Sequence, residues 1–275
     1  MSLTAPVPFK EALDAHDVKS ILATSGRTAD LQQLSGAIKR RALFSATVSN
    51  TELLQKISDG TNTMLTGQGD LATMRLGIKQ LLDDMGYQPD PEQAGGLQDL
   101  SSTARINLQL ETNVDTARGY GWDLQGQDPD VLDEWPAQEL VRDFVPKGKE
   151  RDWAARWARV GGEFFDGRMV ALKNDPIWSK LGDSDIFPDG LDNPYPPFAF
   201  NSGMGVRDID RDEAEQLGLI EANQEVFPRD LSFNAELQAS PDVRDDRLRA
   251  MLEATGLGTF DSEGTFVFND AEGDS

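Results

Sequence analysis

The sequence predicts an α+β protein, with a mainly helical N-terminal half and a compact domain of mixed α/β structure in the C-terminal half. Two observations support this class. Apolar residues recur every three to four positions over much of residues 31–121, which is the spacing of one helix face. From residue 151 onwards, aromatic residues are interspersed with glycines and prolines, which favours short elements joined by tight turns.

Two helices are expected in the first part of the chain in addition to short apolar stripes. The stripes consist of Leu31, Leu34 and Ile38, and of Leu53, Leu54 and Ile57. The clearest helix covers residues 71–85 and is followed by Gly86, a residue type that commonly ends helices. Its apolar side consists of Met74, Ile78, Leu81, Leu82 and Met85. The proline- and glycine-rich segment 88–96 then predicts a loop and a domain boundary.

A second strong helix is expected to follow this loop. Its possible capping residues are Asp99, Ser101 and Ser102. Its apolar stripe repeats at intervals of four, four and three residues and consists of Ile106, Leu110, Val114 and Ala117. Gly119 and Gly121 are expected to end it.

The elements expected in the C-terminal half are shorter. Residues 133–143 favour a helix with Pro136 in its first turn. Residues 167–173 predict a short strand or helix, and the turn-rich segment 182–197 is expected to be irregular. Residues 209–218 predict a short helix, with Asp210 as its cap and Gly218 at its end.

The last part of the chain predicts one more helix and a hairpin. Residues 241–255 have an amphipathic pattern that Gly256 would end. Residues 258–269 favour a hairpin around 262–264, whose apolar side consists of Phe260, Phe266 and Phe268. The final residues, AEGDS, are expected to be disordered. Three domains follow from these limits: residues 1–96, 97–227 and 228–275.

The charge of the chain is strongly negative, at -22, and is unevenly distributed. Residues 1–50 carry six Lys/Arg and four Asp/Glu, whereas residues 205–275 carry six Arg and 18 Asp/Glu. Such a surface repels nucleic-acid phosphate and anionic lipid, so no direct binding to nucleic acid or membrane is expected. The acidity favours solubility, or alternatively a partner with a basic surface or divalent cations.

Several chemistries are excluded by residues that the chain lacks. It has no cysteine, which rules out disulfides, thiolate metal sites and a cysteine nucleophile. Its single histidine is His16, in a polar N-terminal segment. No apolar run approaches 18 residues, and the N-terminus lacks the pattern of a secretory signal. No cofactor is indicated.

Six motifs, taken in order, resemble the phage Mu F-like family of head morphogenesis, or minor head, proteins. They are the helix RINLQLETNVDTARGYG (105–121), the pair Trp153/Trp157, GG-x4-GR (161–168), DPIW (175–178), PYPPF (194–198) and EAEQLGL (213–219). The resemblance covers about residues 40–220. It implies a minor virion component in the virion or host cytoplasm, which would contact portal or capsid proteins during capsid assembly. The gene would then belong to a phage or a prophage.

One departure from the family pattern limits what the resemblance implies. Typical members follow the double proline with a short Cys/His-containing motif, whereas here residues 200–204 are Phe-Asn-Ser-Gly-Met. A metal-binding or nuclease-like role is therefore not carried over.

The aromatic block of the central domain has two interpretations. Its tryptophans are expected in the core; alternatively they form an exposed binding interface, since Trp and Arg are common in binding hot spots. The interface candidates are Trp153, Trp157, Arg168, Trp178 and Phe198. Nearby cations, including Arg156 and Lys173, are expected to pair with Glu163, Asp166 and Asp175.

The acidic residues leave two further alternatives open. A carboxylate-dependent hydrolase, an aspartate-type peptidase or a glycosidase, would use two converging carboxylates with one of them buried. Its candidates are Asp166, Asp175 and Asp208. A cation site would use the acidic loop formed by Asp183, Asp185, Asp189 and Asp192, although this loop does not match the calcium-loop pattern. The preferred prediction is a non-catalytic assembly protein.

Overall fold

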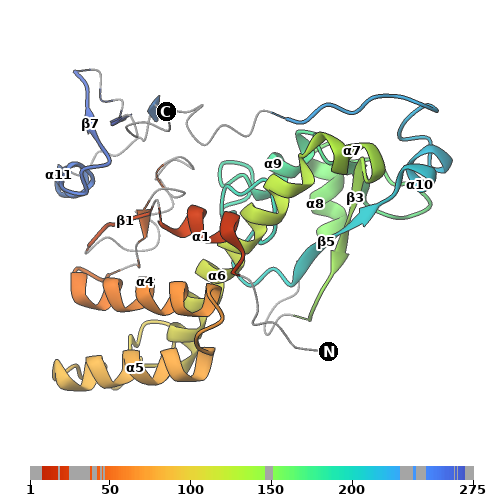
Figure 1. Cartoon of the computed structure of the whole chain (residues 1–275). Helices are drawn as coiled ribbons and strands as arrows, with labels where there is room; N and C mark the ends of the chain where they lie inside the picture. Colours follow the sequence, from red (N-terminus) through yellow and green to blue (C-terminus); the bar gives the residue numbers. More distant parts are fainter. Residues whose placement is uncertain are drawn as a thin grey trace. The chain divides into compact units, whose positions relative to one another are not determined.

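The computed structural model describes residues 8–17, 19–24, 38, 42–43, 45, 47–145, 151–229, 238–239, 246–262, 264 and 266–269. It confirms the α+β class: the N-terminal half is mainly helical, and small sheets lie in the C-terminal part (Figure 1). The chain divides into two compact units. Unit 1 comprises residues 1–114 and 232–275, and unit 2 comprises residues 115–231.

The division between the units falls inside a single helix, α6 (Thr103–Gly126). The sequence places its domain limits in loops, after residues 96 and 227. The structure divides within α6 because the two ends of this helix pack on different partners. Ile106 and Leu110 belong to a core of unit 1, whereas Tyr120 packs edge-on against Tyr195 in unit 2.

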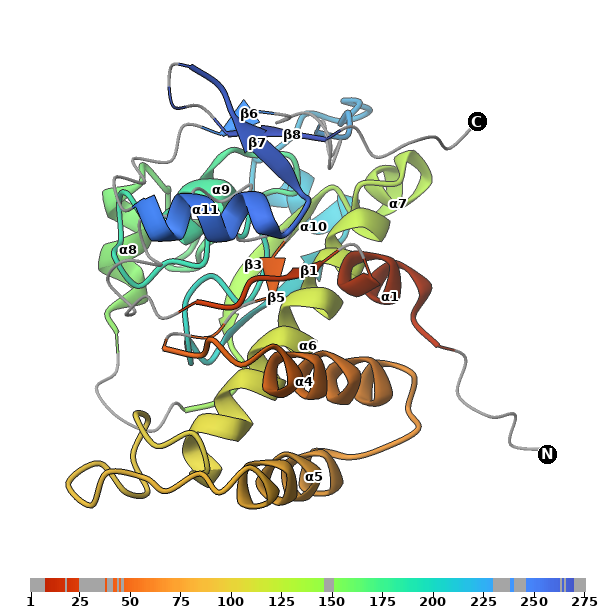
Figure 2. The same cartoon turned by 90° about the vertical axis from the view of Figure 1, so that its left-hand side faces the viewer.

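The N-terminal part of unit 1 contains the helices α1 (Lys10–Asp17), α4 (Thr51–Leu65), α5 (Leu71–Asp84) and the first part of α6. Each of the last three begins at a side-chain cap. Asn50 accepts a hydrogen bond from Leu53 N at 2.9 Å, Asp70 from Thr73 N at 2.8 Å, and Ser102 from Arg105 N at 3.0 Å. The helices α4 and α5 lie side by side in both views (Figures 1 and 2).

The apolar stripes predicted for these helices form one core of unit 1. Leu53, Leu54 and Ile57 of α4 are buried together with residues of α5 and α6. On α5, Ile78 and Leu82 are buried, but Met85 is 40% exposed. The predicted apolar side was therefore one residue too long, because α5 ends before Met85 and Gly86 turns the chain with a φ of 71°.

Short strands complete unit 1. The strand β1 (Ser20–Ile21) pairs in parallel with β2 (Ala42–Leu43). A second sheet has the order β6 (Gln238–Ala239), β8 (Phe266–Phe268), β7 (Gly258–Phe260), with antiparallel pairing throughout. The hairpin expected at 258–269 is thus confirmed. The helix α11 (Asp246–Ala254) precedes it and ends before Gly256, which has a φ of 72°.

These C-terminal elements share a second core with the N-terminal part of the unit. It joins Leu22 and Ile38 to Leu252, Phe266 and Phe268. Leu31 and Leu34, which the sequence placed on one stripe with Ile38, lie outside the described residues, as do residues 241–245 and the final AEGDS.

The prediction that Gly119 and Gly121 end the long helix is wrong, because α6 continues to Gly126. Gly119 serves instead as a packing site. A Cβ at this position would lie 1.9 Å from the carbonyl oxygen of Pro196. The glycine therefore lets a backbone turn approach the helix more closely than any side chain would allow. The stripe from Ile106 to Ala117 is buried as predicted.

Unit 2 contains a three-stranded antiparallel sheet with the order β4 (Val170–Leu172), β3 (Ala137–Arg142), β5 (Met204–Ile209). The helix predicted at 133–143 is therefore wrong. The short helix α7 (Pro129–Glu134) ends before Trp135, and Pro136 restricts Trp135 to a non-helical conformation. Residues 137–142 form the central strand, which is paired with β4 on one edge and with β5 on the other.

Three further short helices belong to unit 2: α8 (Trp153–Arg159), α9 (Ile177–Gly182) and α10 (Arg211–Gln216). Residues 170–172 settle the open alternative for 167–173 as a strand. In α10, Asp210 is the cap that the sequence predicted and accepts a hydrogen bond from Glu213 N at 2.8 Å. Gly218 follows with a φ of 74°.

The close approach at Gly119 predicts the effect of a substitution. Gly119→Ala should lower the free energy of unfolding by about 3 kcal/mol, because the added methyl group meets backbone rather than a movable side chain. The matched control is Gly126→Ala on the same helix, where the nearest atom to a new Cβ is a side-chain carbon of Lys173 at 3.7 Å. It should change stability by less than about 1 kcal/mol. Equal effects in urea unfolding would contradict the role given to Gly119.

Candidate functional site

The aromatic rings predicted as interface candidates form the core of unit 2. Trp157, Trp178 and Phe198 are fully buried and Trp153 is 3% exposed. The rings of Trp157 and Trp178 meet edge to face, with centroids 5.5 Å apart, and Trp178 stacks on Phe198 at 6.1 Å. None of these four rings is therefore accessible to a partner of the folded protein.

The indole N–H groups of Trp157 and Trp178 are both hydrogen-bonded. The Nε1–H of Trp157 donates to the carbonyl oxygen of Glu163 at 2.7 Å, and that of Trp178 donates to the carbonyl oxygen of Leu172 at 2.8 Å. A buried N–H without an acceptor would cost free energy. These bonds therefore hold the turn after α8 and the end of β4 against the rings.

Arg156 is the charged member of this core and is 6% exposed. Its guanidinium lies 3.9 Å from the ring centroid of Phe187 and 4.7 Å from that of Trp153. It donates to the carbonyl oxygen of Leu181 and, at 3.0 Å, to the carboxylate of Asp189. Such a planar cation satisfies several acceptors while packing on aromatic faces.

Arg168, the remaining interface candidate, connects two elements of unit 2. It pairs with Glu139 of β3 at 2.8 Å and with Glu213 of α10 at 2.6 Å. Arg207 also pairs with Glu139, at 2.5 Å. The hydrogen bond from Arg168 is the main reason that the pKa of Glu139 is lowered. The guanidinium is thus engaged within the unit.

Arg156 and Lys173 are ion-paired, but with other acids than the sequence suggested. Arg156 pairs with Asp189 and Lys173 pairs with Asp208 at 2.9 Å. The predicted partners Glu163, Asp166 and Asp175 form none of the ion pairs found in the described residues. Proximity along the chain did not identify these partners.

The three hydrolase candidates have separate positions. Asp166 is exposed in a turn between the bridged residues Phe165 and Arg168. Asp175 is half-buried and accepts a hydrogen bond from Ile177 N at 2.7 Å, at the start of α9. Asp208 is exposed and paired with Lys173. None of the three is a buried acid, which the hydrolase hypothesis required.

The four aspartates of the acidic loop also have different contacts. Asp189 pairs with both Arg151 and Arg156, and although burial acts to raise its pKa, these two arginines hold that pKa below its ordinary value. Asp183 accepts from the backbone N–H of Asp185 at 2.8 Å, and Asp192 from that of Ser184 at 2.8 Å. Within the described part of the chain, no group of three or more His, Asp or Glu residues could hold a metal ion.

A buried polar network in unit 2 was not predicted from the sequence. Asp123 of α6 pairs with Arg229, and the two side chains are 7% and 15% exposed. Gln127 donates to the carbonyl oxygen of Lys173 at 3.0 Å and accepts from Arg229 N at 2.9 Å. No sequence pattern signals this network, because Arg229 lies 106 residues after Asp123.

The Asp123 carboxyl group of this network has a perturbed pKa. Burial raises its pKa to about 6, although Arg229 and Lys173 act in the opposite direction. A pKa in this range suits a general acid, but a second carboxylate is not among the polar contacts of Asp123 in the described residues. The network therefore fastens the segment that ends at Arg229 onto α6.

His16 in unit 1 has a serine as neighbour but not the arrangement of a catalytic triad. Its Nε2 lies 3.1 Å from the carbonyl oxygen of Ser58 and 3.3 Å from the Ser58 hydroxyl. Its Nδ1 is buried and has no hydrogen-bond partner among the described residues. A triad requires a third group that orients this nitrogen. The histidine therefore fastens α1 to α4.

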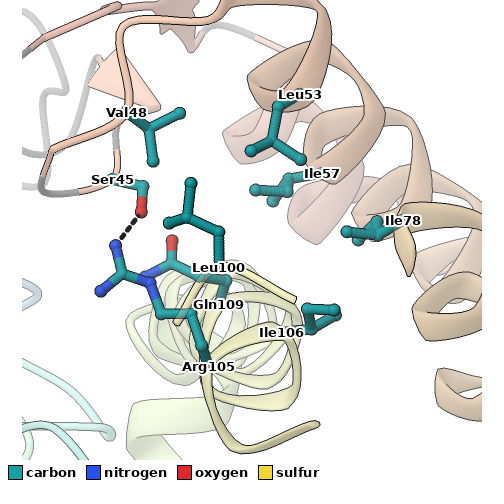
Figure 3. Close-up of a pocket in the computed structure, with 9 residues that line it drawn as sticks. All are labelled: Ser45, Val48, Leu53, Ile57, Ile78, Leu100, Arg105, Ile106 and Gln109. Atoms are coloured by element: carbon teal, nitrogen blue, oxygen red, sulfur yellow. Dashed lines mark hydrogen bonds between the residues drawn. The ribbon is translucent and has the colours of Figure 1, made fainter. Parts of the chain in front are cut away.

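A small pocket in unit 1 offers no catalytic acid (Figure 3). Six apolar side chains line it: Val48, Leu53, Ile57, Leu100, Ile78 and Ile106. Its polar lining residues are Ser45, Arg105 and Gln109, and Arg105 donates to the Ser45 hydroxyl at 2.5 Å. A lining without carboxylates cannot support the acid–base chemistry of the hydrolase hypothesis.

Comparison with protein-family models, with curated proteins and with solved structures found no match to this chain. Of the helices in the described residues, none is both long and apolar enough to cross a membrane.

The burial of Trp157 predicts a large loss of stability on truncation. Trp157→Ala should lower the free energy of unfolding by roughly 3–5 kcal/mol, because it leaves a cavity in the core of unit 2. Trp122→Ala is the control, since Trp122 is 64% exposed and should cost less than about 1 kcal/mol. If both variants melt like the wild type, the core assignment of Trp157 is wrong.

The raised pKa of Asp123 predicts a specific pH dependence. The folded state holds this proton up to about pH 6, whereas the unfolded chain loses it near its ordinary pKa of 3.8. The stabilisation is thus complete below the unfolded value and is lost as the pH rises through about 6, with a magnitude on the order of 3 kcal/mol. Asp123→Asn removes this ionisation. Between pH 4 and 7, the stability of the wild type should fall relative to the variant; parallel curves from chemical denaturation would contradict the shift.

Proposed function

We propose that this chain is a phage or prophage minor head protein that acts in capsid assembly near the portal through protein–protein contacts. It would reside in the virion or, before assembly, in the host cytoplasm. The proposal starts from the ordered motifs of the sequence, which resemble the Mu F-like family. No catalytic step is part of it.

The observation that carries the proposal is the structural use of the residues that make up those motifs. Trp157 and Trp178 lie in the core of unit 2, Asp175 accepts a hydrogen bond from Ile177 N at the start of α9, and Arg168 connects β3 to α10. Gly119 of the long helix packs under Pro196 of the double-proline turn. If the motif residues are needed for folding, they explain why their order and spacing resemble those of the family. The resemblance then does not require that this chain and the family share a reaction.

The distribution of exposed apolar side chains supports a role in contacts. Several large apolar residues of unit 2 are well exposed, including Val145 at 78%, Phe227 at 65%, Trp122 at 64% and Phe144 at 55%. Aromatic side chains of this kind dominate the energetics of many protein interfaces. The hydrolase alternative has no comparable support in the described residues, because its candidate acids cap helices, lie exposed in turns or form ion pairs.

Two experiments test this proposal. The gene should lie beside portal and terminase genes. The full chain, co-expressed with the portal and major capsid proteins encoded beside it, should sediment with assembled procapsids at low copy number. If procapsids assemble and the chain stays in the soluble fraction, the assembly role is contradicted. Hydrolysis of a peptide or glycan polymer that Asp175→Asn or Asp208→Asn abolishes would favour the hydrolase instead.

A further inference from the structure

Among the described residues, the strand β5 is paired on one edge only, and the hydrogen-bond pattern shows which residues face the other edge. Leu140 of β3 donates its N–H to the carbonyl oxygen of Met169 at 2.9 Å, so its main-chain groups point toward β4. Leu140 stands opposite Val206 of β5. In an antiparallel pair, the N–H and C=O of one residue point to the same side. The main-chain groups of Val206 therefore point away from β3.

Met204 and Asp208 lie two positions before and after Val206, so their main-chain groups also point away from β3. The N–H of Met204 donates to the Ser202 hydroxyl at 3.3 Å. The main-chain groups of Val206 and Asp208 have no hydrogen-bond partner within the described part of the chain. Val206 is half-buried and Asp208 is exposed. The edge thus presents donors and acceptors about 7 Å apart, the repeat of an extended chain.

This edge lacks two of the features that usually prevent strand addition, a proline and a bulge. Proteins protect exposed edges with prolines, bulges or charged side chains. The pairing of β5 with β3 is one to one over all six residues, and no proline interrupts it. Its two charged side chains are exposed, at 59% for Arg207 and 56% for Asp208, but each is ion-paired within the unit, Arg207 with Glu139 of β3 and Asp208 with Lys173.

An apolar surface lies at the Met204 end of β5. The N–H groups of Asp143 and Phe144 both point to the carbonyl oxygen of Gly203, at 3.0 and 3.3 Å. These contacts bring the end of β3 beside the turn that precedes β5 (Figure 1). The two segments carry three exposed apolar side chains, which we call the sheet-end patch: Phe144 at 55%, Val145 at 78% and Phe200 at 40% exposure.

We infer that β5 is a docking strand, and that its occupant is an extended, basic segment of a partner protein with an apolar residue seated on the sheet-end patch. Strand addition supplies main-chain hydrogen bonds, and the patch supplies an apolar anchor. The net charge of -22 attracts a cationic chain and repels a second copy of this protein. The inference rests on the proposed function only for the identity of the partner. The unpaired edge of β5 is observed independently of that function.

The test uses the full chain and a synthetic peptide, Phe-Lys-Val-Lys-Val-Lys-Val-Lys-Phe, followed by fluorescence anisotropy. The peptide should bind, and should bind at least tenfold more tightly than the same sequence with Glu in place of Lys. Methylation of every peptide amide should weaken binding at least tenfold, because it removes the donors. Binding should also slow hydrogen exchange at the amides of Val206 and Asp208, which needs no variant.

Two variants locate the contact. Val206→Pro removes one outward N–H at a position where an edge strand tolerates proline, and should weaken binding at least tenfold. Val206→Thr keeps the N–H and the branched side chain and should bind like the wild type; circular dichroism checks that both fold. Should Val206→Pro fail to fold, the hydrogen-exchange result decides.

Other outcomes overturn the inference. Absence of peptide binding, or binding without protection at Val206 and Asp208, would show that β5 does not accept a strand. A dimer of the chain alone, seen by sedimentation and lost in Val206→Pro, would make a second copy the occupant. If the peptide binds but the chain never joins procapsids, the docking strand is supported and the assembly function is rejected. If the chain joins procapsids but the peptide does not bind, only the docking strand is rejected.

Discussion

The packing of Trp157 against Trp178 is the interaction on which unit 2 depends. Both rings are fully buried, and each indole N–H needs an acceptor inside the protein. The acceptors are main-chain carbonyls of Glu163 and Leu172, so the turn after α8 and the end of β4 must stand at fixed positions beside the rings. The sheet and its connections are arranged around that requirement.

The same burial explains how the unit uses its charges. Arg156, which lies over the rings of Trp153 and Phe187, pairs with Asp189, and Arg168 pairs with Glu139. The chain as a whole carries an acidic excess, with a net charge of -22. A contact surface on this protein is therefore expected to combine apolar side chains and main-chain groups with attraction for basic partners.

Elements with strong local signals could be predicted, and elements that depend on distant pairing could not. The helix α5 was predictable because its apolar spacing, the cap at Asp70 and the turn at Gly86 lie within a few residues of one another. Residues 137–142 have no such signal and become a strand because they are paired on both edges. The candidate site shows the same division: the bulky aromatics were recognised, whereas the pairing of Asp123 with Arg229 was not.

By itself, the sequence determined the α+β class, the caps of α6 and α10, the ends of α5, α10 and α11, and an acidic chain without cysteine chemistry. Each of these depends on residue type and short-range spacing, which can be read directly from the sequence. Only the tertiary structure decided that the tryptophans are internal, that Gly119 is a packing site, and that β5 has an unpaired edge. Those features depend on which distant backbone segments approach one another, and no local pattern specifies that approach.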